Sequence, residues 1–392
     1  MAHPPSRNFG LDVLRAAAIM LVLLAHGLSG VTTRNPLLLP LGSGGYYGVE
    51  LFFVLSGFLI GGILLRGVEK EGSFSTADLR SFWIRRWFRT LPSYFLFLAV
   101  NLALWSFLPG FARPAGLQPE VGSYLIFLQN FSQPISRFFG VSWSLAVEEW
   151  FYLTFPLLLL FLLRGLRRKV LAVWLAILVF ALVPVLLRAL QQDAGDWDGG
   201  LRKIVLFRLD SVMYGVAAAA ISFYHPAWWR RLRPLVWLGL ALLAGVYLFF
   251  HMVPDEQFIV DHALARAFLF PATSLGFMLM LPRFCELQPR GGAFGFAVTR
   301  VSRWSYSAYL CHPPLMFAIT GGWKHFFPDN RWFLLKGGLW LASVFALSAL
   351  LFRFFEKPMM DLRDRPLFGS RKAGRKPPAV VSPVEPAPGD AG

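Results

Sequence analysis

Long apolar segments are the feature that most constrains this chain. Ten such runs follow one another along 392 residues, of which 56% are hydrophobic and only 15% charged. A run of about 20 apolar residues crosses a bilayer as a helix. The runs lie near residues 10–30, 46–65, 91–109, 143–163, 169–190, 204–224, 234–251, 262–282, 303–322 and 332–355. The sequence therefore predicts an all-α, polytopic membrane bundle of about ten transmembrane helices.

The distribution of basic residues predicts the orientation of this bundle. If the N-terminus is cytoplasmic, 25 of the 38 lysines and arginines fall on the cytoplasmic side and seven on the opposite side. Because cytoplasmic loops of membrane proteins are enriched in Lys and Arg, both termini are expected in the cytoplasm. This asymmetry accounts for most of the net charge of +16, so we expect a lipid bilayer and no nucleic acid as a partner.

A single membrane unit is expected over residues 9–358, after a short N-terminal tail at 1–8. Residues 359–392 read as a cytoplasmic tail that is basic and then Pro-rich, with a composition typical of disorder from 377. Neither C-x-x-C nor H-E-x-x-H occurs, so no metal site is expected. The sequence does not indicate an oligomeric state.

The first apolar run carries three ionisable residues, Asp12, Arg15 and His26. Charges within a membrane span normally face a protein interior or a polar site. Steps of three and four residues place all three on one helical stripe, which we predict to face inward. Arg15 and His26 are eleven residues apart, or about 16 Å along a helix, so they must act at different depths.

His26 is expected in the outer half of the membrane, and Glu50 and Glu148 enter from the outer ends of their helices. A histidine oriented by a carboxylate commonly takes a proton from a hydroxyl group, which makes His26 a candidate general base. The alternative is a core histidine that bonds a backbone carbonyl. Glu148 and Glu149 lie about 100° apart on a helix, so one is expected inward and the other at the interface.

The segment RSFWIRRWFRTLP alternates arginines with aromatic residues at the predicted cytoplasmic face. Its Arg85, Arg86 and Arg89 could bind phosphate groups through their guanidinium groups. They could equally contact anionic lipid headgroups.

Two further pairs favour structural roles. Arg208 and Asp210 are expected to pair inside the bundle. Cys311 and His312 point apart because they are adjacent on a helix, which favours core packing for Cys311.

Five motifs occur in a fixed order at plausible distances. They are LDVLRAAAIMLVLLAH, GVELFFVLSGFLI, FWIRRWFRTLP, SWSLAVEEWFYLTFP and SYSAYLCHPPL. Together they resemble the membrane-bound acyltransferase-3 family, whose members include O-acetyltransferases of bacterial surface glycans. The resemblance covers roughly residues 9–358, the whole predicted membrane unit; some members of the family also carry a soluble C-terminal domain.

The resemblance implies an enzyme of the bacterial inner membrane that transfers an acyl group, acetyl above all, from acyl-CoA to a saccharide hydroxyl. The acceptor would be lipopolysaccharide, exopolysaccharide or a lipid-linked sugar, with a macrolide or other small molecule as an alternative. A transporter or flippase of lipid-linked saccharides is a further alternative. The site residues implied are an essential pair, Arg15 and His26, the acidic residues Glu50 and Glu148, and the acyl-CoA segment with Arg85, Arg86 and Arg89.

Overall fold

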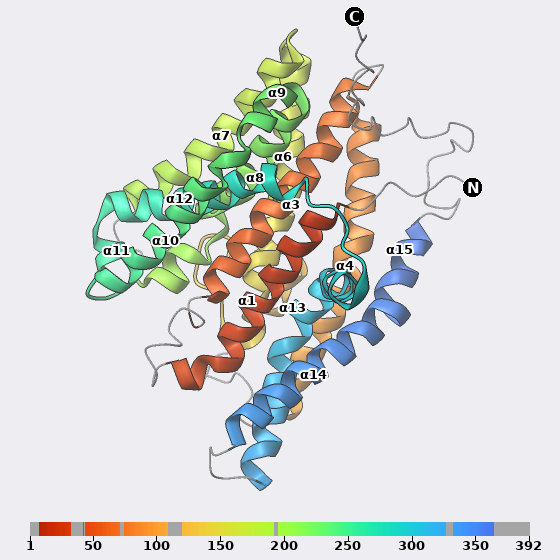
Figure 1. Cartoon of the computed structure of the whole chain (residues 1–392), viewed down its shortest axis with the longest axis vertical. Coiled ribbons are helices and arrows are strands. Elements are labelled where there is room, and N and C mark those ends of the chain that lie inside the picture. The colour runs from red at the N-terminus through yellow and green to blue at the C-terminus, as the bar shows by residue number, and fades with distance from the viewer. Residues whose placement is uncertain are drawn as a thin grey trace, which may run out of the picture.

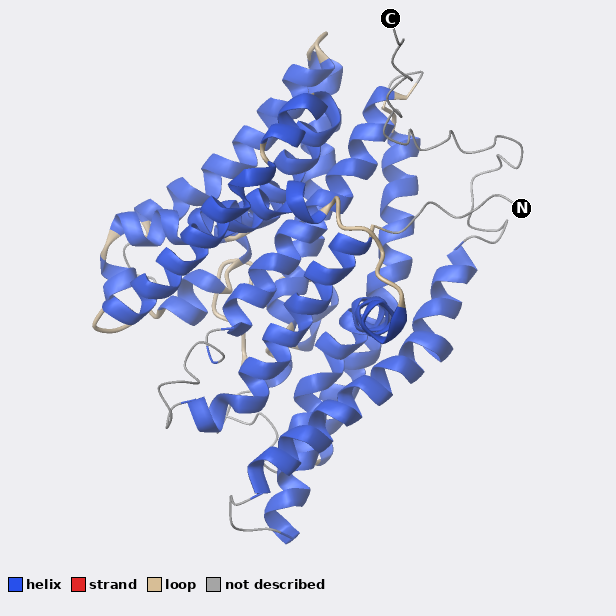
Figure 2. Ribbon diagram, viewed as in Figure 1, coloured by secondary structure: helices blue, strands red, loops and turns tan. Residues whose placement is uncertain are grey.

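The computed structural model is a bundle of helices (Figure 1). It describes residues 8–32, 42, 44–70, 74–108, 120–191, 195–326 and 332–363. Within these ranges there are helices and no strands, which confirms the predicted all-α class (Figure 2). The predicted Pro-rich segment from residue 377 lies outside the described residues.

The long helices follow the predicted apolar runs. They are α1 (Phe9–Thr32), α3 (Gly44–Glu69), α4 (Thr76–Phe107), α6 (Ser142–Gly165), α7 (Lys169–Leu190), α8 (Leu209–Tyr224), α10 (Val236–Met252), α12 (Ala263–Phe284), α13 (Gly292–Phe326) and α14 (Phe333–Leu351). Short helices connect or extend them: α5 (Val121–Leu125), η3 (Asp198–Arg202), η4 (Val205–Phe207), α9 (Pro226–Arg231), α11 (Gln257–Asp261), η7 (Phe352–Glu356) and α15 (Lys357–Arg363).

Eight helices in the described part of the chain are long and apolar enough to cross a membrane. The protein is thus a multi-pass membrane protein. The sixth and ninth predicted spans correspond to α8 and α13, which are not among these eight. The count of ten and the orientation of the termini therefore stay predictions.

The arginine-rich segment is the first part of α4, which begins at Thr76, well before the predicted start at 91. Ser75 and Asp78 cap this helix reciprocally: the Asp78 amide donates to Ser75 Oγ at 3.3 Å, and the Ser75 amide donates to Asp78 Oδ2 at 3.0 Å. One continuous helix therefore carries Arg86 and Arg89 into the bundle.

Helix α1 lies at the centre, packed against α3 and α13 (Figure 1). Helix α3 also packs closely on α8, where a Cβ atom on Gly57 would lie 1.8 Å from the Val212 carbonyl oxygen. A Cβ on Gly215 would lie 2.0 Å from that of Val54, so only glycine permits this backbone approach at either position. Helices α10 to α12 lie on one side of this centre, and α13 and α14 lie on the other (Figure 1).

The orientation predicts which loops an impermeant thiol reagent reaches in intact cells. In a protein whose native cysteines, Cys285 and Cys311, are replaced by alanine, Asp261→Cys should be labelled directly. Arg231→Cys, on the predicted cytoplasmic side, should be labelled only after the cells are permeabilised. The reverse pattern would show that the bundle is inserted the other way round.

Candidate active site

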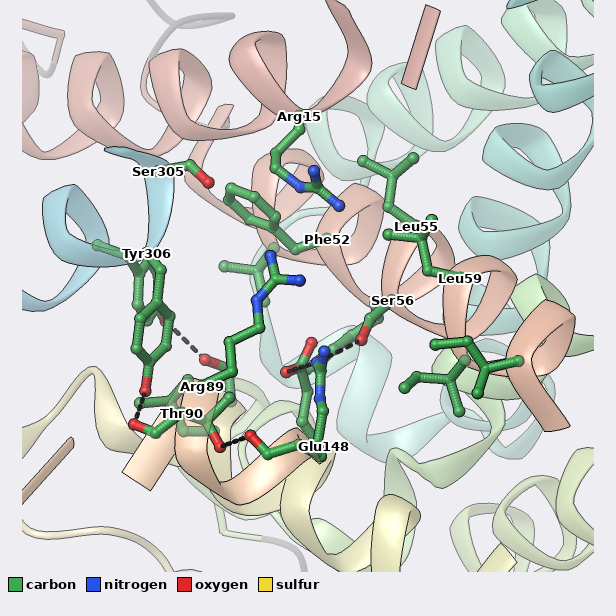
Figure 3. A pocket seen from close by; sticks show the side chains of 18 of the residues that line it. Arg15, Phe52, Leu55, Ser56, Leu59, Arg89, Thr90, Glu148, Ser305 and Tyr306 are labelled. Atoms are coloured by element: carbon green, nitrogen blue, oxygen red, sulfur yellow. Dashed lines mark hydrogen bonds and ion pairs between the residues drawn. The ribbon is translucent and has the colours of Figure 1, made fainter. Parts of the chain in front are cut away.

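A cavity of about 280 Å³ lies between α1, α3, α4, α6 and α13 (Figure 3). We call it the arginine cavity. Its polar lining residues are Arg15, Ser56, Arg66, Arg86, Arg89, Thr90, Ser144, Glu148, Ser305, Tyr306 and Tyr309. Four arginines with one carboxylate make a lining of net positive charge, which suits an anionic ligand.

Arg86 is held on one wall by a polar network. Its Nη2 lies 3.5 Å from Glu148 Oε2 and donates to Ser56 Oγ at 3.3 Å and to the Tyr152 hydroxyl. The Tyr152 hydroxyl in turn donates to Glu148 Oε2 at 2.8 Å. The Arg86 guanidinium also lies 4.2 Å from the centre of the Tyr152 ring. These contacts fix Arg86 in place before any ligand arrives.

Arg15 and Arg89 extend into the cavity from opposite walls, from α1 and α4 (Figure 3). Arg15 Nη1 lies 3.9 Å from Asp12 Oδ1, and Asp12 also accepts a hydrogen bond from Ser302 of α13 at 2.8 Å. The predicted inward stripe of α1 is therefore buried against α13 at this end.

The cavity opens past exposed residues. Arg66 and Arg89 are both exposed and both line it, and Ile63 beside them is 48% exposed. Arg66 was not among the predicted site residues. A charged group could enter here and meet two guanidinium groups first.

Arg85 takes no part in this cavity. It is exposed and absent from the lining, whereas Arg86 and Arg89 share one face of α4 because they are three residues apart. Adjacent residues on a helix differ by about 100°, so one of the three predicted arginines had to point elsewhere.

His26 lines a different cavity, of about 560 Å³, which we call the histidine cavity. Its other lining residues are Ala25, Gly42, Gly45, Tyr46, Trp197, Asp198, Arg202, Phe250, Val253, Pro254, Asp255 and Glu256. Burial alone would raise the pKa of the Asp198 carboxyl. The positive charges and hydrogen bonds of Arg202 and Lys203 have the larger effect, so this pKa lies below its ordinary value. Aromatic rings beside charged groups suit a hydroxyl-rich ligand.

The His26 ring is oriented by its own helix. Its Nδ1 lies 2.9 Å from the Val22 carbonyl oxygen, which can only accept, so Nδ1 carries the proton. Nε2 then holds the lone pair of the neutral ring, as a general base requires.

The two candidate carboxylates lie elsewhere. Glu50 is fully buried, where it accepts a hydrogen bond from Arg208, and Ser274 Oγ lies 3.5 Å from its other oxygen. Glu148 lies in the arginine cavity with Arg86. The structure thus places each carboxylate beside an arginine, in contrast to the predicted placement beside His26.

Two other expectations need correction. Asp210 pairs with Arg188, Oδ2 to Nη2 at 2.6 Å, whereas Arg208 pairs with Glu50, so the role is structural but the partners differ from those predicted. One of Glu148 and Glu149 was expected at the interface, but both point inward: Glu148 lines the arginine cavity, and Glu149 is buried, where its Oε1 accepts a hydrogen bond from Thr90 of α4 at 2.8 Å.

Sequence reasoning considered His312 only beside Cys311 and missed its contact with His26. It is fully buried on α13, and its ring centre lies 4.9 Å from that of His26. It lies three residues after Tyr309, which lines the arginine cavity, and the two ring centres are 5.8 Å apart. The three-residue steps from Tyr306 to Tyr309 to His312 would have indicated one helical face toward the site.

Comparison with known proteins decides the family. A sequence model described as an acyltransferase domain matches residues 8–354. The chain belongs to the acyltransferase-3 family. Both cavities lie within the matched region, and no solved structure matches the chain.

Several curated proteins are similar to this acyltransferase. The peptidoglycan O-acetyltransferase OatA of Listeria monocytogenes is 28% identical over 369 residues, which is 89% of this chain and 55% of that protein. The putative peptidoglycan O-acetyltransferase YrhL of Bacillus subtilis is 31% identical over 48% of this chain and 29% of its own length. A putative O-acetyltransferase of Staphylococcus aureus is 31% identical over 41% of this chain and 26% of its own. The chain thus spans about half, or less, of the relatives it matches.

A structural role for Glu50 in the acyltransferase predicts how its replacement acts. Glu50→Ala leaves the buried Arg208 without a counter-ion and should destabilise the protein by about 3–5 kcal/mol. Thermal unfolding in detergent measures this. The double change Glu50→Leu with Arg208→Met should recover most of the loss, since a buried pair can be replaced by apolar packing. A catalytic Glu50 would instead lose turnover at unchanged stability.

Proposed function

We propose that this acyltransferase is an O-acetyltransferase of the bacterial cytoplasmic membrane. It transfers the acetyl group of acetyl-CoA to a hydroxyl of a saccharide acceptor, such as peptidoglycan, lipopolysaccharide, exopolysaccharide or a lipid-linked sugar. The observation that carries this proposal is the pair of cavities in one bundle, a basic cavity with Arg15 and a second cavity with His26. The names of the relatives support acetyl as the group and peptidoglycan as one acceptor.

The arginine cavity suits the donor. CoA carries phosphate groups at one end and its thioester at the far end of a narrow arm. The phosphates would meet Arg66 and Arg89 at the exposed mouth, where bidentate guanidinium contacts are strong. The arm would then pass Arg15 and Arg86 deeper in the cavity.

The histidine cavity suits the acceptor. Tyr46, Trp197 and Phe250 offer flat apolar surfaces to a sugar ring, and Asp198 and Arg202 offer hydrogen-bonding groups. The buried ring of His312 lies between the two cavities, because it contacts Tyr309 of the arginine cavity and His26 of the histidine cavity. For the transfer, the thioester would have to reach past Tyr309 and His312 to an acceptor hydroxyl at His26.

The reaction needs a general base and a nucleophilic attack by the acceptor hydroxyl on the thioester. His26 Nε2 would take the proton of the acceptor hydroxyl as its oxygen attacks the thioester carbonyl carbon. The C–S bond then breaks, and the proton passes to the leaving thiolate of CoA.

A donor role for the arginine cavity predicts a difference between neighbouring arginines. Arg86→Gln and Arg89→Gln should each weaken acetyl-CoA binding about tenfold or more, because each removes charge-assisted hydrogen bonds. Arg85→Gln, on the same helix but outside the cavity, is the matched control and should stay within about twofold. Calorimetry of the purified protein measures the three affinities. Equal effects at all three positions would assign the segment to lipid contact.

The proposed base predicts that His26→Ala lowers turnover about 10²- to 10⁴-fold while acetyl-CoA affinity stays nearly unchanged. His251→Ala is the matched control, because His251 Nδ1 also lies 2.8 Å from a carbonyl oxygen four residues back but lines neither cavity. Transfer of radiolabelled acetyl groups from acetyl-CoA to the cell's envelope glycans measures turnover. Loss of CoA binding in His26→Ala would place the donor at His26 instead.

A further inference from the structure

His312 is a buried histidine in an unusual state. Its Nδ1 lies 2.8 Å from the Tyr309 carbonyl oxygen and 3.2 Å from that of Ala308. Carbonyl oxygens only accept, so Nδ1 carries the proton and Nε2 holds a lone pair. Among the described residues, that Nε2 has no hydrogen-bond partner, and the side chain is fully buried.

An unpartnered buried acceptor costs stability, and a phenylalanine would fill the same space without that cost. A buried polar atom without a partner in a native structure calls for an explanation, and we look for it in the neighbouring ring of His26. The ring of His26 lies 4.9 Å away, centre to centre and tilted by 46°, at the edge of the histidine cavity.

We propose that His312 is a positioning residue for His26, whose ring it contacts from α13 and whose imidazolium it stabilises through the lone pair on Nε2. This inference rests on the proposed function. When the acceptor hydroxyl gives its proton to His26, a positive charge forms on a ring that has a buried electron pair beside it. His312 gains and loses no proton. The Val22 carbonyl sets the tautomer of His26, and His312 acts on the charge that forms on that ring.

The other contacts of the pair fit this role. Trp340 of α14 donates its Nε1 proton to the His312 carbonyl at 3.1 Å, which holds this part of α13 in place. The charged groups that act on His26 are Asp198, Arg202 and Lys203, on the side of the histidine cavity. In this arrangement no carboxylate competes with His312 from α13 or α14.

Two variants and a neighbour test the proposal. His312→Phe keeps a ring but removes the lone pair, and should lower kcat about tenfold or more with KM for acetyl-CoA unchanged. His312→Gln keeps an acceptor and should retain kcat within about threefold. Cys311→Ala, an equally buried position on the same helix that contacts Ser348 instead, is the control and should leave kcat unchanged.

A spectroscopic measurement separates this inference from the proposed function. The ¹⁵N resonances of His26, assigned with the His26→Ala variant, should shift in both His312 variants and not in Cys311→Ala. If no acetyl transfer is found but these resonances shift, the contact holds and the proposed function fails. Unshifted resonances, or equal kcat in wild type and His312→Phe, would overturn the positioning role; should the Phe variant not fold, the Gln variant gives the same resonance test.

Discussion

The cost of burying charge in an apolar bundle organises this structure. A buried ion whose partner is removed destabilises a protein by several kcal/mol, so charges in the interior must be compensated within it. Arg208 with Glu50 and Arg188 with Asp210 meet this requirement with fully buried side chains. These pairs tie α8 to α3 and α7. The arginines of the arginine cavity are different, because they surround an open space and outnumber the carboxylates there. Excess positive charge around a cavity is what marks it as a site.

Helix α1 contributes a side chain to each of the two cavities. It carries Arg15 into one cavity and His26 into the other, and eleven residues of helix separate them by about 16 Å. Helix α13 runs beside it and supplies Tyr309 to the first cavity and His312 to the contact with His26. Two neighbouring helices thus carry a cation-lined cavity and, further along, an imidazole that lines a second cavity. This arrangement suits a transfer in which donor and acceptor approach from opposite sides of the bundle.

The helices and the placement of Arg15 and His26 could be predicted from the sequence, whereas the contacts between distant helices could not. Apolar runs gave the helices, and helical spacing put Arg15 and His26 at different depths on α1. Spacing could also have separated Arg85 from Arg86 and Arg89. The partners of Glu50, Glu148 and Arg208 could not be derived, because they depend on how helices distant in sequence rotate and tilt against one another. Depth along a predicted helix put Glu148 near His26, yet it lies with Arg86, 62 positions away in the chain. Burial of His312 beside His26 is likewise a tertiary contact.

Acetyl transfer across a sealed membrane tests directly whether donor and acceptor enter by different cavities. The protein is reconstituted in liposomes of one orientation, with radiolabelled acetyl-CoA on one side and soluble muropeptides on the other. Labelled saccharide should form only when acetyl-CoA is on the side of Arg66 and the muropeptides are on the side of Glu256. Transfer that requires both substrates on the same side would contradict it.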